Sequence, residues 1–131
     1  MDRIARALPV VLILGAYVAL EAVAAANARP RMEAAYIYPR LVEARVAAER
    51  CGGVADDQAA RFEQVLDRTR ARLGRELAEG EPPLEGAAIE DEIMALARSA
   101  EREAAAVLDA GGCEGPAARS LLGRHRIYSR K

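Results

Sequence analysis

The chain has 131 residues, of which 52% are apolar, and its formal net charge at pH 7 is −1. This length allows a single domain, and the near-neutral charge argues against a general nucleic-acid-binding surface, so no nucleic-acid partner is expected. Four Tyr, one Phe and no Trp leave a core that depends on small side chains and close helix contacts. Ala, Leu, Arg and Glu dominate the sequence and are strong helix formers, which predicts an all-α protein.

The first 28 residues predict either a signal peptide or an uncleaved membrane anchor. Arg3 and Arg6 precede an apolar run from Ala7 to Leu20, and Ala26-Asn27-Ala28 offers a small-x-small cleavage site. Fourteen apolar residues span about 21 Å as a helix, short of the ~30 Å hydrocarbon core, but residues 7–28 together are long enough to associate with a membrane. Under both interpretations the following residues lie outside the cytoplasm, either in the periplasm, secreted, or tethered to the inner membrane.

Residues 29–123 are predicted to form an extracytoplasmic helical domain, and its first helix is expected to begin at Pro39. Proline suits the first turn of a helix. Apolar residues then recur every three or four positions up to Cys51, which places that thiol on the buried face. Gly52 and Gly53 are expected to end this helix after about Arg50.

Two longer amphipathic segments follow and predict a helical hairpin. The second helix is expected from Asp56 or Asp57 to about Ala78, and the third ends near Ala110. Residues 80–86, with two prolines, make a turn too short for anything but an antiparallel pair. The residues predicted to be buried between these helices are Leu66, Leu73, Ile93 and Ala100.

The two cysteines are predicted to form one structural disulfide. Cys51 comes just before the second helix and Cys113 just after the third, so both lie at the open end of the hairpin. Neither is in a Cys-x-x-Cys motif, which argues against thiol–disulfide exchange chemistry. An oxidising compartment suits such a bridge, and closing a loop of this length stabilises a fold by about 4 kcal/mol in the chain-entropy estimate.

A short fourth helix is expected to open at Pro116 and end at Gly123, followed by a basic C-terminal tail, residues 124–131. From Arg119 onwards there are five bases and no acid, whereas the stretch from Glu79 to Glu92 has six acids and no base. Arginine and tyrosine often dominate interface energetics, so the C-terminal strip is the predicted contact with a partner protein. Its predicted partner-binding residues are Arg119, Arg124, Arg126, Ile127, Tyr128, Arg130 and Lys131.

No motif in the sequence predicts catalysis. His125 is the only histidine, and its position between two arginines of the tail predicts exposure to solvent. No second group completes a Ser–His or Cys–His pair, and no glycine-rich loop or haem motif is present. We therefore expect no catalytic residue, no metal site and no organic cofactor.

These features predict a non-catalytic exported helical protein that acts by protein–protein interaction. The alternative is a single-pass accessory subunit of a membrane protein complex, held by an uncleaved N-terminal helix. A periplasmic stress or metal sensor is a weaker alternative, because such a protein would need more His or Met. Anionic lipid headgroups compete with a protein as the target of the basic tail.

Overall fold

The computed structural model describes residues 33–130, which form four helices and no strand. The helices are α2 (Glu33–Cys51), α3 (Asp56–Ala78), α4 (Ala87–Gly111) and α5 (Pro116–Tyr128). The predicted all-helical fold is confirmed for this part of the chain. The predicted signal peptide or anchor, residues 1–28, lies outside the described residues. Within residues 33–130, no helix has both the length and the apolar character needed to cross a membrane.

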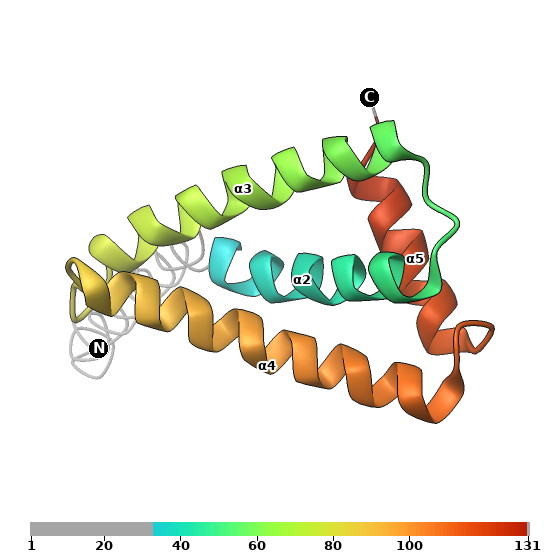
Figure 1. The fold of residues 1–131 in the computed structure, drawn as a ribbon. Helices are drawn as coiled ribbons and strands as arrows, with labels where there is room; N and C mark the ends of the chain where they lie inside the picture. The colour runs from blue at the N-terminus through green and yellow to red at the C-terminus, as the bar shows by residue number, and fades with distance from the viewer. Residues whose placement is uncertain (1–32, 131) are drawn as a thin grey trace, which may run out of the picture. The chain divides into compact units, whose positions relative to one another are not determined.

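Helix α2 is the centre of the domain (Figure 1). Helices α3 and α4 diverge from the turn that joins them, α2 lies between them, and α5 crosses the open end. The α3–α4 hairpin is thus present, but α2 separates much of its two inner faces. The prediction that four residues of this hairpin are buried is confirmed. They are Leu66, Leu73, Ile93 and Ala100. All four belong to a cluster that also contains Leu41 and Val42 of α2.

Small side chains allow α2 to approach its neighbours closely. Ala44 and Ala47 on α2 have no exposed surface. Near the open end, Ala47 packs with Ala104 of α4 and Ala118 of α5, together with two leucines. Because each alanine buries little area, the helices gain stability by close contact along their length rather than from large side chains.

Helix α2 begins at Glu33, six residues before Pro39. The prediction that Pro39 opens this helix is therefore wrong, because the proline lies inside it. Proline in a helix interior removes one backbone hydrogen bond and costs about 3 kcal/mol. Contacts with α3 hold the extra turn in place. The Ala34 N–H donates to both carboxylate oxygens of Glu76, each at 3.1 Å, and Arg72 pairs with Glu33 at 2.6 Å.

The predicted disulfide between Cys51 and Cys113 is confirmed. The two Cα atoms are 5.4 Å apart, and the bridge joins residues that are 62 positions apart in the sequence. It joins the last residue of α2 to the connection between α4 and α5. Gly52, directly after Cys51, has a φ of +69°, a left-handed conformation that lets the chain leave α2 sharply.

Helix α5 does not end at Gly123 as predicted but continues to Tyr128. Buried positions recur at Ala118, Leu121, His125 and Ser129, in steps of three, four and four. The helical period therefore continues through the supposed tail, with a histidine and a serine at its apolar positions. The expected exposure of His125 is also wrong, because only 2% of its surface is exposed.

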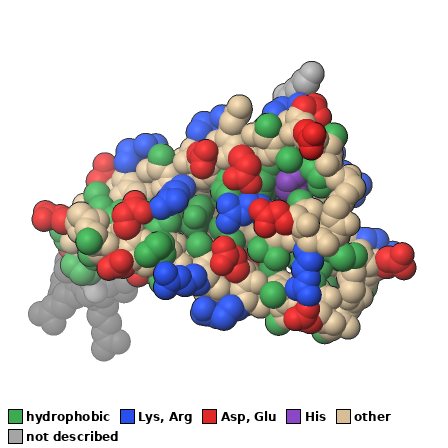
Figure 2. All heavy atoms as spheres, in the orientation of Figure 1, with side chains coloured by type: hydrophobic (Ala, Val, Ile, Leu, Met, Phe, Trp, Pro, Cys, Tyr) green, Lys and Arg blue, Asp and Glu red, His purple; other side chains and the backbone are tan. Residues whose placement is uncertain are grey.

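Ion pairs cover α2 on the face shown in Figure 2, where acidic and basic side chains alternate. Arg45 of α2 lies 3.8 Å from Glu63 on α3 and 3.7 Å from Glu101 on α4. Arg70 on α3 reaches Glu90 on α4 at 2.6 Å. Exposed pairs contribute little each, but together they connect the two diverging helices over α2.

Candidate functional site

The predicted partner-binding strip lies on and just beyond α5, and its residues have different environments. Arg124 is turned inward: its Nη1 donates to the Arg40 carbonyl and to Glu43 Oε2, each at 3.1 Å. This makes Arg124 a link between α5 and α2 rather than a contact for a partner. Lys131 lies outside the described residues. The predicted residues that remain at the surface are Arg119, Arg126, Ile127, Tyr128 and Arg130.

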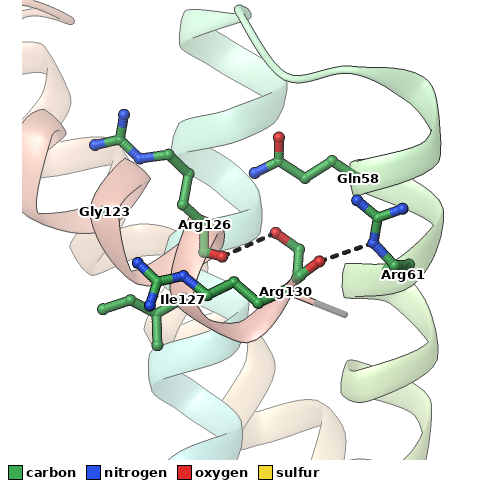
Figure 3. A pocket seen from close by; sticks show the side chains of 7 residues that line it. Gln58, Arg61, Gly123, Arg126, Ile127 and Arg130 are labelled. Carbon is green, nitrogen blue, oxygen red and sulfur yellow. Dashed lines mark hydrogen bonds between the residues drawn. The ribbon is translucent and has the colours of Figure 1, made fainter.

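Three of these residues line a groove between α5 and the first turns of α3. The groove has a volume of about 520 Å³. Figure 3 shows Arg126 and Arg130 extending in the same direction, while Gln58 and Arg61 project from α3 on the other side. Its full lining, named the α3–α5 groove below, is Gln58, Arg61, Gly123, Arg126, Ile127, Ser129 and Arg130.

A stack of two buried rings fixes α5 against α3 beneath this groove. The rings of Phe62 and His125 have centroids 4.0 Å apart and lie 17° from parallel. Phe62 is fully buried. Because each ring neighbours a groove residue in sequence, Arg61 and Arg126 respectively, the stack sets the distance between the two walls.

Ser129 closes the end of α5 and ties it to α3. Its backbone N–H donates to the His125 carbonyl at 3.1 Å, and its hydroxyl donates to the same carbonyl at 2.7 Å. The Ser129 carbonyl in turn accepts a bond from Arg61 Nε at 2.8 Å. These bonds satisfy the His125 carbonyl in the last turn of α5 and hold Arg61 in one orientation.

The charges of the groove are unevenly compensated. Arg61 Nη1 donates to Asp57 Oδ2 at 2.8 Å, and this bond lowers the pKa of Asp57. Arg126 and Arg130 form no ion pair with any residue between 33 and 130. The α5 wall of the groove is therefore positively charged and has no counterion among residues 33–130.

Apolar surface borders these charges. Ile127 is 58% exposed and Tyr128 is 38% exposed, although both lie at the end of a well-packed helix. Arginine beside exposed aliphatic and aromatic side chains is the composition typical of a protein contact surface. Arg119 lies on the same face of α5 as Arg126, two turns earlier, and extends the positive stripe by about 10 Å.

His125 itself is enclosed and does not face the groove. Burial lowers the pKa of His125, and no residue between 33 and 130 forms a hydrogen bond with Nδ1. A general base must reach a proton of the substrate, and this imidazole instead lies flat against Phe62. Its place in the domain is structural.

Two further features of residues 33–130 bear on ligand binding. No group of three or more His, Cys, Asp or Glu side chains gathers there in a way that would hold a metal ion. A second, smaller groove of about 220 Å³ lies between α4 and α5, with Val107 and Leu121 at its apolar surface and Glu43 and Glu103 among its lining residues.

Sequence reasoning missed Gln58 and Arg61 as groove residues. The predicted disulfide places the start of α3 near the start of α5, but the groove lies at the far end of α5. The sequence therefore contains no signal for these two residues. No protein-family model matches the chain, and no curated protein or solved structure is detectably similar to it.

Proposed function

We propose that this protein is a non-catalytic, exported helical protein that acts by binding another protein through the α3–α5 groove. The observation that carries the proposal is the pair Arg126 and Arg130, which have no counterion within residues 33–130 and flank the exposed Ile127. Arg126 stands on α5 and Arg130 lies two residues past its end, and the Phe62–His125 stack anchors this end of the helix, so a partner would meet an ordered surface. Preorganised contacts cost less entropy on binding.

Helix-end electrostatics explain part of this surface without a partner. Positive charges in the last turn of a helix are favoured by the helix dipole. That effect accounts for Arg126, but it gives no reason for an exposed isoleucine and an adjoining groove. A binding function accounts for the charges, the apolar surface and the hollow together.

Export is the second part of the proposal and is supported by the structural disulfide, which suits an oxidising compartment. A cleaved, periplasmic form and a form anchored as accessory subunit of a membrane complex would use the same groove. They differ only in residues 1–28, and the intact mass of the protein isolated from its own cells distinguishes them.

The binding function is tested by removing the two unpaired charges of the groove. We expect Arg126→Gln with Arg130→Gln to reduce capture of the partner from a periplasmic or membrane extract about tenfold or more, since interface arginines contribute about 1–2 kcal/mol each. Point substitutions are preferable to removing residues 124–131, because truncation would also remove the buried His125 and Ser129.

The matched control is Arg98→Gln with Arg102→Gln. Like the groove pair, these two arginines of α4 are exposed, lie four residues apart and form no ion pair within residues 33–130. The control should capture the same proteins as the parent. Equal capture by the groove variant, or equal loss in the control, would contradict the proposed binding surface.

A further inference from the structure

The chemistry of the α3–α5 groove identifies the kind of segment that it would bind. Its α5 side carries two guanidinium groups of the same charge, from Arg126 on α5 and from Arg130 just beyond it, and neither is paired with a carboxylate of residues 33–130. Two like charges that line the same hollow repel each other. A carboxylate from a partner would relieve the repulsion and would gain charge-assisted hydrogen bonds from either guanidinium.

The α3 wall adds groups that a simple anion does not require. Gln58 presents an amide with both a donor and an acceptor, which matches the two polar groups of a peptide backbone. Arg61 is held by Ser129 and Asp57 through Nε and Nη1, which leaves Nη2 without a hydrogen-bond partner among residues 33–130. These groups face α5 across the hollow rather than pointing out from a flat surface (Figure 3).

Gly123 leaves open space on the α5 wall of the groove, one turn before Ile127. A Cβ built on Gly123 would meet no atom within 4 Å, so the hollow is empty above this residue. Glycine inside a helix costs about 1 kcal/mol relative to alanine. At this position its missing side chain provides room for one from a partner, beside the exposed Ile127.

From this arrangement we infer that the α3–α5 groove binds an acidic segment of a protein, with carboxylate side chains at Arg126 and Arg130, an apolar side chain at Ile127 and the segment's backbone at Gln58. This inference rests on the proposed binding function and specifies its partner. An anionic membrane is the competing target, and a lipid surface would use the arginines without needing the space above Gly123 or the amide of Gln58.

The test is a titration of the ¹⁵N-labelled, oxidised full-length protein with two synthetic peptides, followed by amide chemical shifts. One peptide is Glu-Glu-Leu-Glu-Glu with blocked ends, and the other has Gln in place of every Glu. We expect the acidic peptide to shift the amide signals of residues 58–61 and 123–130. The Gln peptide should bind at least about tenfold more weakly.

Two variants separate insertion into the groove from loose electrostatic attraction. Gly123→Leu fills the hollow and keeps every arginine, and leucine favours the helix more than glycine does. We expect this substitution to weaken binding of the acidic peptide about tenfold, and the double variant Arg126→Gln with Arg130→Gln should do the same. The control variant Arg98→Gln with Arg102→Gln should bind like the parent.

Three outcomes would overturn the inference: equal binding of the two peptides, unchanged binding by Gly123→Leu, or groove-dependent binding to vesicles with 30% anionic lipid but not to the acidic peptide. If the arginine pair still governs capture of a protein from extract while the acidic peptide fails to bind, only the acidic-segment inference fails. If capture is also independent of the pair, the proposed function fails as well.

Discussion

At the scale of single residues, His125 shows how a polar side chain can serve as a core residue. It occupies the position in α5 that an apolar residue would take and stacks on Phe62 with 2% of its surface exposed. Its Nδ1 has no hydrogen-bond partner among residues 33–130, and a second proton on the ring would place a charge in an apolar environment. Burial therefore lowers the pKa of His125, which favours its neutral form.

This burial predicts a specific dependence of stability on pH. The pKa of His125 is lowered in the folded state from about 6.5, so below that pH the unfolded chain binds a proton that the folded chain does not. The free energy of unfolding should level off well above pH 6.5 and fall as the pH drops toward and below that value. The slope approaches at most about 1.4 kcal/mol per pH unit.

Urea unfolding of the parent and of His125→Phe between about pH 5.5 and 7.5 checks this prediction. Phenylalanine keeps a ring against Phe62 and has no titrating nitrogen, so its stability should not change across the window. The parent contains no other histidine, and carboxylates titrate mostly at lower pH. Equal slopes for the two proteins would show that His125 is solvated or paired in the folded state.

At the scale of elements, the sequence predicts well which face of each helix is buried. It predicts less well which other helix that face contacts. The 3.6-residue period of the hairpin helices correctly indicates Leu66, Leu73, Ile93 and Ala100 as core. The period contains no information on the neighbouring helix, so the insertion of α2 between α3 and α4 was not predicted. That arrangement depends on the fit of Ala44 and Ala47 to both neighbours, which only the assembled structure shows.

The two errors in helix limits have a common physical origin. A proline predicted to start α2 and a glycine predicted to stop α5 both lie inside helices. Each is a local preference of about 1–3 kcal/mol. Tertiary contacts outweigh it: the Glu76 carboxylate binds the first turn of α2, and the Phe62–His125 stack holds the last turns of α5.

Close helix packing makes Ala100 one of the most sensitive positions. It is 2% exposed and belongs to the cluster shared by α2, α3 and α4. We expect Ala100→Glu to lower the free energy of unfolding by about 3 kcal/mol or more, because a carboxylate would be buried without a partner in a space that holds only a methyl group. Thermal unfolding followed by circular dichroism measures the effect.

The control for this substitution is Ala95→Glu on the same helix. Ala95 is exposed, so the added glutamate would point into solvent and should change stability by less than about 0.5 kcal/mol. Similar melting temperatures for the two variants would mean that α4 presents a different face to α2.

At the scale of the whole domain, the disulfide and the groove lie at the same end of the α3–α4 hairpin. The bridge between Cys51 and Cys113 holds the end of α2 next to the start of α5, and α5 then crosses to α3. The sequence predicted the bridge and the positive strip separately. It did not predict that Gln58 and Arg61 would form the opposite wall, because this depends on the direction α5 takes after Pro116.

The central claim is that the protein meets its partner at the end of α5, and photo-cross-linking in the protein's own cells tests it most directly. A photoreactive amino acid at Ile127, which is 58% exposed, should give a discrete cross-linked protein band. The same group at Met94, which is 41% exposed on α4, should give no such band. The substitutions Arg126→Gln and Arg130→Gln together should abolish the band obtained from Ile127. A band of equal strength from both positions, or one from Met94 alone, would contradict the claim.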